Sequence, residues 1–154
     1  MVTHNKTVLH YLELLDNIAS GERRAGVFLQ AWADTTPDPE LRACLSMVAN
    51  REMSHYQIFK RRIEELGGTW TETADPDFAA RLQVNSSRIP DVEKMRWANA
   101  RQAQRQGPTI RNRYEAAMVD ETVDPLTRAL LRWFAAVEAD SGARLRALYD
   151  RMEG

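Results

Sequence analysis

The chain contains an internal repeat with an offset of 86 residues. Asp38-Pro39 recurs as Asp124-Pro125, and Glu52 recurs as Glu138 at the same distance beyond that pair. An Asp-Pro pair is a strong start signal for a helix, because the carboxylate caps free backbone N–H groups and proline suits the first helical position. A single helical hairpin cannot bury its own apolar face, so the two copies are expected to pack against each other.

Four segments show the apolar spacing of three and four residues that is typical of amphipathic helices. They run from His4 to Ala33, from Pro39 to Gly67, from Asp91 to about Asp120, and onward from Pro125. The turn before Pro39 is short, so the first two helices are expected to be antiparallel neighbours. Gly67-Gly68 favours a helix end, and Gly107-Pro108 favours a kink or a break within the third segment.

The stretch between the two copies, residues 69–90, lacks sustained periodicity and is rich in Thr, Asp, Ser and Pro. It is predicted to be an extended crossover with one helical turn near Phe78 to Leu82, held to the bundle by Trp70 and Phe78. The sequence therefore predicts an all-α fold: an antiparallel four-helix bundle of two helical hairpins joined by a long crossover, forming a single domain over residues 1–154.

Composition argues against several classes of partner. The net charge is −1, and Lys and Arg are spread along the chain, so neither nucleic acid nor an anionic membrane surface is an expected partner. The N-terminus leads into an amphipathic segment rather than an apolar run, which predicts no signal peptide, no membrane span and a cytoplasmic protein. A single cysteine, Cys44, excludes a disulfide or a Cys-ligated iron centre within one chain.

Two polar side chains occupy core positions of the second segment. Glu52 and His55 are three residues apart, so they leave the same face of the helix, and that face is the apolar one. The residues that share it are Leu41, Leu45, Val48, Phe59, Ile63 and Leu66. Burying an ionised carboxylate is unfavourable unless a cation or hydrogen-bond donors compensate, so this pair needs a partner.

Two further carboxylates interrupt apolar stripes. Glu22 lies on the stripe of the first helix, and Glu138 on that of the last. Glu22 lies about 14 residues before the first turn and Glu52 about 15 after it, so at a rise of about 1.5 Å per residue both reach the same height. Glu138 stands equally far beyond the second turn. Three carboxylates and one imidazole are thus expected to converge on one slice of the core.

This donor set predicts a metal site formed by Glu22, Glu52, His55 and Glu138. Mixed oxygen and nitrogen ligands suit iron, with manganese or zinc as alternatives. At the repeat offset, His55 falls on Ser141 and Glu22 on Pro108, so the second half keeps one polar core residue of three and one bound ion is expected rather than two.

The alternative is a metal-free polar core in which salt bridges satisfy these groups. Arg105 and Arg111 lie close to Pro108 in the sequence, so either guanidinium could then take the place of a second metal ion.

Several of these motifs resemble those of the ferritin-like superfamily, and within it the rubrerythrin-like proteins. The motifs are Gly21-Glu-Arg-Arg-Ala25, Glu52-Met-Ser-His55 and Glu138-Ala-Asp-Ser141, together with the pair of hairpins. The run from Ala49 to Gln57 is also similar to that of the di-iron hydroxylases that modify tRNA. The resemblance covers nearly the whole chain.

The resemblance implies ligand roles. In such proteins Glu22 would be a terminal ligand, His55 the imidazole ligand, and Glu52 and Glu138 the bridging carboxylates. The second metal position would lack its imidazole and its terminal carboxylate, and Glu115 lies two turns from the required level. No Cys-x-x-Cys pair is present, so the chain lacks the electron-transfer iron of rubrerythrins.

The expected function is that of a ferritin-like metal-binding protein, an iron- or manganese-dependent oxidoreductase that acts on dioxygen or peroxide with an incomplete second metal site. The alternative is a non-catalytic bundle that serves as a structural or interaction module. The resemblance also implies a homodimer. Asn99, Gln102, Gln104 and Gln106 either line a substrate pocket or form a solvated edge, and the second interpretation is preferred. No motif identifies a small-molecule substrate.

Overall fold

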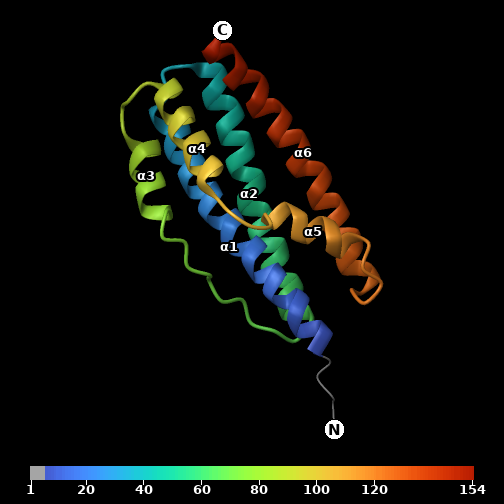
Figure 1. Ribbon diagram of the computed structural model, residues 1–154. Helices are drawn as coiled ribbons and strands as arrows, with labels where there is room; N and C mark the ends of the chain where they lie inside the picture. Colours follow the sequence, from blue (N-terminus) through green and yellow to red (C-terminus); the bar gives the residue numbers. More distant parts are fainter. Residues whose placement is uncertain (1–5) are drawn as a thin grey trace.

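The computed structural model describes residues 6–154, with side chains from His10 onward. His4, where the first predicted helix begins, lies outside the described residues. Six helices follow one another in the described range: α1 (Lys6–Thr35), α2 (Pro39–Glu65), α3 (Phe78–Ser86), α4 (Asp91–Gln104), α5 (Ile110–Met118) and α6 (Pro125–Glu153). Together they form a helical bundle, so the predicted all-α fold class is confirmed (Figure 1).

The two Asp-Pro start signals work as the repeat predicts. Asp38 accepts hydrogen bonds from the backbone N–H groups of Glu40 and Leu41, and Asp124 accepts one from Thr127, with proline as the first residue of each helix. At its other end α2 stops before Gly67, whose φ of 87° lies in the left-handed region that glycine adopts without strain. Local backbone chemistry therefore sets the ends of these two long helices.

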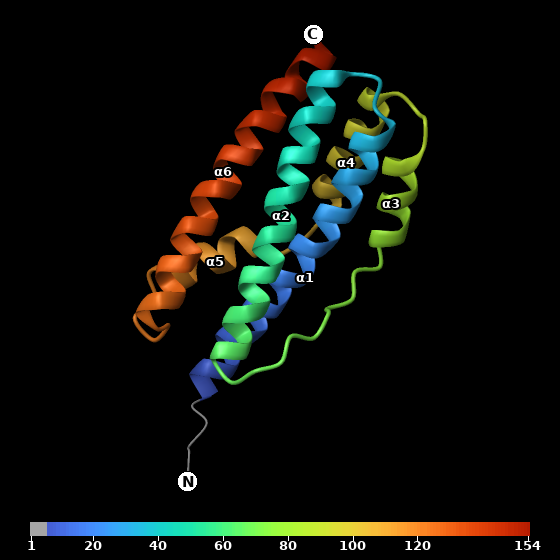
Figure 2. The ribbon, with the colours of Figure 1, turned by 180° about the vertical axis from the view of Figure 1, so that it is seen from behind.

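The long helices α1, α2 and α6 pack around two apolar clusters at different heights. One cluster contains Leu15, Phe59 and Phe134, and the other contains Trp32 and Leu45 together with the C-terminal part of α6. In both ribbon views α2 lies beside α1 on one side and beside α6 on the other (Figures 1 and 2). The slice of the bundle between the two clusters is the place where the polar core residues lie.

The third position of the bundle is divided between two helices. α4 ends at Gln104, Gly107 has a φ of 84°, and α5 begins only at Ile110, so the break predicted at Gly107-Pro108 is confirmed. The connection between them passes the bundle at mid-height, and α5 runs across the long helices rather than along them (Figures 1 and 2). Asn99, Gln102, Gln104 and Gln106 are exposed, which agrees with the solvated edge preferred for them, and Ile110 is exposed as well.

The crossover contains more helix than the sequence indicates. One turn was expected near Phe78, but α3 extends over nine residues to Ser86. The reason is a buried polar contact network: Lys94 Nζ donates to the Asn85 carbonyl at 2.8 Å and to Thr35 Oγ1 at 2.7 Å, and Asn85 Nδ2 donates to the Phe28 carbonyl at 2.9 Å. Polar side chains thus dock α3 on α1, which an apolar pattern does not reveal.

Trp70 holds the extended part of the crossover to the bundle, as expected. Its ring packs edge-on against Tyr56 with centroids 5.1 Å apart, and its Nε1 donates to Ser20 Oγ at 3.3 Å. Phe78 is only half-buried. In the described range, no helix is long and apolar enough to cross a membrane.

Asp124 joins three long helices and predicts a large stability effect. Besides capping α6, its carboxylate accepts from Arg62 of α2 at 2.8 Å and from Tyr11 of α1 at 3.0 Å. Burial opposes its charge, but the hydrogen bonds from Thr127 outweigh burial and lower the pKa of Asp124 to about 2. We expect Asp124→Ala to lower the free energy of unfolding by about 2–4 kcal/mol, measured by urea denaturation.

Asp38 supplies the matched control for that variant. It caps α2, but among the described residues its carboxylate accepts from two backbone N–H groups alone, so Asp38→Ala should lower the free energy of unfolding by only about 1 kcal/mol. Because the folded pKa of Asp124 lies below the ordinary value of 3.8, its stabilisation is present above that value and is lost as pH falls toward about 2. Equal losses in the two variants would contradict the role of Asp124 as a junction.

Candidate metal centre

Four side chains from three helices meet between the two apolar clusters. Glu22 comes from α1, Glu52 and His55 from α2, and Glu138 from α6, and each offers one ligand atom that lies within 4.8 Å of the other three. The structure therefore brings together all four residues that the sequence singled out. As the matched distances from the two turns predicted, they lie at one height of the bundle.

The site is largely closed to solvent on the α1 and α2 side. Glu22 is 6% exposed, Glu52 5% and His55 1%, whereas the side chain of Glu138 is 29% exposed. The His55 ring is held edge-on by Trp133 and Phe134, with centroid distances of 5.1 Å to each. Aromatic packing thus fixes the imidazole, and Glu138 marks the side on which the site opens.

Hydrogen bonding within the site is incomplete. His55 Nδ1 lies 3.5 Å from Glu138 Oε1 and 3.8 Å from Glu22 Oε2, which is too long for good hydrogen bonds. All three of these atoms are buried and have no hydrogen-bond partner in the described part of the chain. Buried polar atoms are nearly always satisfied, so three orphaned atoms that face one another are a feature to be explained.

A metal ion accounts for this spacing. Two ligand atoms that each lie about 2.0–2.2 Å from a metal can be at most about 4.4 Å apart. The four ligand atoms lie within 4.8 Å of one another, so small side-chain adjustments bring them onto one ion. The set of three carboxylates and one imidazole suits iron, manganese or zinc. The group of Glu22, Glu52, His55 and Glu138 can therefore hold a metal ion.

The pKa values of Glu22 and His55 also indicate that these groups lack a compensating partner. Burial raises the pKa of Glu22 to about 7, because the ionised carboxylate is poorly solvated and Glu138 lies nearby. Burial lowers the pKa of His55, but the carboxylates of Glu138 and Glu22 outweigh burial and raise that pKa to about 9. Without a metal, the site retains protons at neutral pH that a bound cation would displace.

The second half of the pseudosymmetric site is filled differently. Ser141 is buried where the repeat places the counterpart of His55, and its Oγ accepts a hydrogen bond from Arg51 at 3.0 Å. Arg51 also forms an ion pair with Asp140 at 2.7 Å. Pro108 lies in the exposed break before α5 and offers no ligand. A guanidinium thus lies beside the position where a second imidazole would be required.

The two arginines considered for a metal-free core lie elsewhere. Arg111 pairs with Glu115 at 2.8 Å, and in the described part of the chain neither Arg111 nor Arg105 forms an ion pair with the four site residues. Glu115 does not belong to the cluster, as its level in the sequence indicated.

A cleft of about 940 Å³ opens from the site toward α5 and the break that precedes it. Glu22, Glu52 and Glu138 lie in its wall, and so do six arginines: Arg24, Arg81, Arg105, Arg111, Arg113 and Arg146. Of these, the sequence had drawn attention only to Arg105 and Arg111; it gave no functional signal for the other four. Only the break between α4 and α5 drew attention to this region, because an arginine on an amphipathic helix is ordinarily a solvated surface residue.

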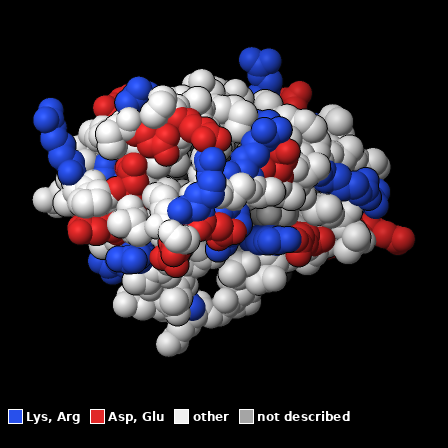
Figure 3. Space-filling model, turned by 90° about the horizontal axis from the view of Figure 1, so that it is seen from above, with Lys and Arg blue, Asp and Glu red and all other residues white. Residues whose placement is uncertain are grey.

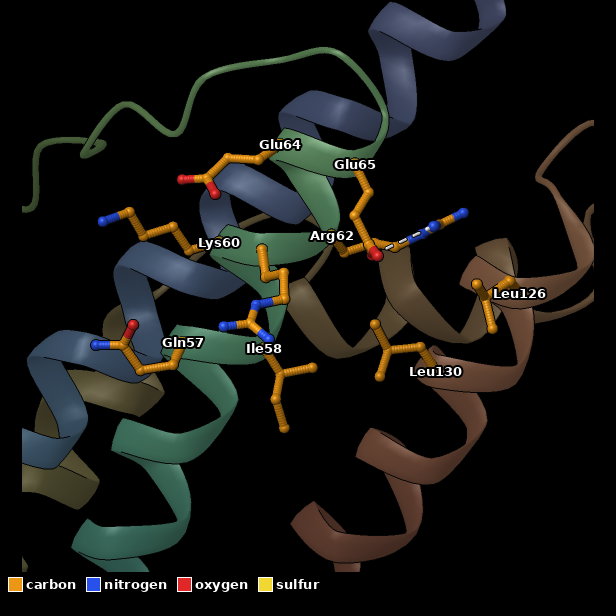
Figure 4. Close-up of a pocket in the computed structure, with 9 residues that line it drawn as sticks. Gln57, Ile58, Lys60, Arg62, Glu64, Glu65, Leu126 and Leu130 are labelled. Carbon is orange, nitrogen blue, oxygen red and sulfur yellow. Dashed lines mark hydrogen bonds and ion pairs between the residues drawn. The ribbon is translucent and has the colours of Figure 1, made fainter.

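A second groove lies between α2 and α6, near the end of the bundle that holds the start of α6. Ile58, Leu126 and Leu130 face one another across it, while Lys60 and Glu64 extend away from it (Figure 4). Arg62 and Glu65, which both line this groove, form an ion pair at 3.5 Å (dashed line in Figure 4). It contains none of the four candidate ligands.

Comparison with known proteins places this architecture in a family. The ferritin-like domain family of actinomycetes matches residues 4–149. The chain belongs to this ferritin-like family. No curated protein and no solved structure matches it. The family match supports the predicted ferritin-like superfamily, while similarity to rubrerythrins and to the tRNA hydroxylases stays a prediction.

Proposed function

We propose that this ferritin-like protein binds one iron or manganese ion through Glu22, Glu52, His55 and Glu138 and is an oxidoreductase that acts on dioxygen or peroxide. The observation that carries the proposal is the set of buried, mutually facing ligand atoms without hydrogen-bond partners. A bound iron ion would supply one-electron redox chemistry at the site.

The protein's own residues would set the conditions for that chemistry. His55 and the three carboxylates bind the ion, and Trp133 and Phe134 fix the imidazole and exclude water from one side. Glu138 is the most exposed ligand and faces the cleft, so a small oxidant would approach past it. Arg51 and Ser141, which occupy the second half, favour one ion over two.

The proposal is tested by metal analysis of protein expressed in iron-supplemented medium. We expect about one equivalent of iron per chain in the wild type, and less than about a tenth of that in Glu52→Ala, since removal of a ligand from a four-ligand site weakens metal binding severely. Glu115→Gln is the matched control, because Glu115 lines the same cleft outside the cluster. It should retain the metal.

Redox function has a separate readout. The protein is loaded with Fe²⁺ without oxygen and then mixed with dioxygen or hydrogen peroxide, while oxidation of the bound iron is followed by its absorbance. We expect oxidation faster than that of free Fe²⁺ at the same pH. A metal-free preparation whose stability is indifferent to chelators would instead support a non-catalytic helical module.

Homodimerisation, implied by the ferritin-like resemblance, remains part of the proposal. We expect light scattering to give about twice the chain mass of 17.6 kDa at micromolar concentration. A monomeric mass over a tenfold range of concentration would contradict it.

A further inference from the structure

The cleft beside the candidate metal centre has more cations than its own carboxylates neutralise. Arg24 pairs with Asp75 at 3.7 Å and Arg111 with Glu115 at 2.8 Å. The other carboxylates in the wall are Glu22, Glu52 and Glu138, which a bound divalent ion would engage. Among the side chains described from His10 onward, no carboxylate forms an ion pair with the remaining four arginines: Arg81, Arg105, Arg113 and Arg146.

Arg81 is the most constrained of these four. Its guanidinium lies over the Phe28 ring, 4.2 Å from the centroid, and its Nε is buried without a hydrogen-bond partner in the described structure. Burial lowers the pKa of Arg81, and the nearby positive charge of Arg105 lowers it further. The charges of Asp75 and Asp77 act on that pKa in the opposite direction without cancelling these effects. Two guanidinium groups that repel each other in a partly closed cleft, with an N–H left over, are the donors that a bound oxyanion would satisfy.

These arginines lie next to the ligand cluster. Arg81, Arg146, Glu52 and Glu138 line both the main cleft and an adjoining compartment of about 300 Å³. Apolar side chains also line both compartments, and Phe28 and Ala25 are common to the two. The space thus brings guanidinium groups and apolar side chains together beside the metal ligands. Its size is that of pockets that enclose a small organic molecule.

We propose that this cleft binds a small organic molecule with a carboxylate or phosphate group, which contacts Arg81, Arg105 and Arg146 while its apolar part lies against Phe28 and points toward the ligand cluster. The inference deepens the proposed function, because it assigns a substrate class to the same site. The anion site itself requires only the arginines and can be tested with or without metal.

The charges outside the cleft argue for a small ligand rather than a polyanion. On the face seen in Figure 3, acidic side chains lie among the basic ones over the whole surface, so no continuous basic track is present there. Four arginines without an ion pair among the described side chains, Arg81, Arg105, Arg113 and Arg146, line one concave place. A ligand that fits this distribution carries one compact anionic group.

The test is calorimetric titration of the full chain with four probes: hexanoate, hexyl phosphate, the neutral hexanol and inorganic phosphate. We expect one of the two amphiphilic anions to bind at least tenfold more tightly than hexanol, and the preferred one identifies the head group. Inorganic phosphate alone should bind more weakly than hexyl phosphate if the apolar wall contributes. Tighter binding in the Mn²⁺-loaded protein is also expected, because the ion neutralises nearby carboxylates.

Variants of single arginines test whether the anion binds in this cleft. Arg81→Gln and Arg146→Gln should each weaken binding of the preferred anion at least tenfold, and Arg23→Gln, whose guanidinium pairs with Glu72 outside the cleft, should not change it. Arg146 is exposed, so its variant keeps the test valid if Arg81→Gln fails to fold. Metal content is measured on the same samples and should remain at the wild-type level.

The outcomes separate this inference from the proposed function. Anion binding to a protein that takes up no metal supports the inference and removes the metal proposal. Metal uptake with no preference for either anion over hexanol overturns the inference alone, as does unchanged binding in both arginine variants. A short RNA oligonucleotide that binds more tightly than hexyl phosphate would also overturn it, in favour of a polyanion.

Discussion

At pH 8, saturation with Mn²⁺ is expected to raise the thermal unfolding midpoint of the chelator-treated protein by about 5–10 °C. A ligand that binds only the folded state at about 100 times its dissociation constant contributes about 2.7 kcal/mol. For a chain of this size, each kcal/mol shifts the midpoint by about 2–4 °C. The measurement is differential scanning calorimetry of one preparation with excess chelator or excess Mn²⁺.

The size of that shift should depend on pH. The pKa values of Glu22, about 7, and His55, about 9, both lie above the ordinary values of 4.5 and 6.5. The folded metal-free protein therefore binds more protons than the unfolded chain, so its stability falls as pH rises from about 4.5 to about 9. Metal binding needs deprotonated ligands and strengthens over the same range. We expect the gap between the two midpoints to widen from pH 6 to pH 9.

The control for this experiment is Glu52→Ala, which should show little shift with Mn²⁺ at any pH. A wild-type midpoint that does not move with Mn²⁺ at pH 9, where proton competition is weakest, would refute the metal centre. A shift that is equally large in Glu52→Ala would instead locate the stabilising ion elsewhere on the protein.

The parts of this structure that the sequence predicted depend on local chemistry. Helix starts at Asp38-Pro39 and Asp124-Pro125 follow from capping, and the break before α5 follows from the backbone limits of Gly107-Pro108. The four candidate ligands could be identified because polar residues on an apolar stripe stand out. Equal distances from two turns then place them at one height, since helix rise is constant.

The parts of the structure that the sequence did not predict depend on contacts between residues that are distant in the chain. Lys94 has the sequence context of a surface residue, yet it is 1% exposed because the Asn85 carbonyl and Thr35 accept its hydrogen bonds. The length of α3 follows from that contact. Arg81 likewise acquires its place over Phe28 only when α3 docks on α1. No periodicity encodes such pairings, so the arginine-rich wall of the cleft was not predicted.

Glu22→Gln should make the metal-free protein more stable while it abolishes stoichiometric metal binding. At pH 8 the wild-type carboxylate is largely ionised in a site that disfavours its charge, as its raised pKa shows. The amide has nearly the same shape and no charge, so it avoids that penalty, although it also gives up attraction to protonated His55. We expect a net gain of about 1–3 kcal/mol in the free energy of unfolding, measured with chelator present.

The gain in the free energy of unfolding of Glu22→Gln should depend on pH, which a substitution of an exposed carboxylate would not produce to the same extent. Below about pH 5 Glu22 is protonated in the folded wild type, so the advantage of Glu22→Gln should shrink toward zero there and grow toward pH 8. Glu115→Gln removes an exposed carboxylate whose partner is Arg111, and it should change stability by less than about 0.5 kcal/mol. A destabilised Glu22→Gln protein at pH 8 would mean that Glu22 has a satisfied structural role rather than that of a ligand held ready for a cation.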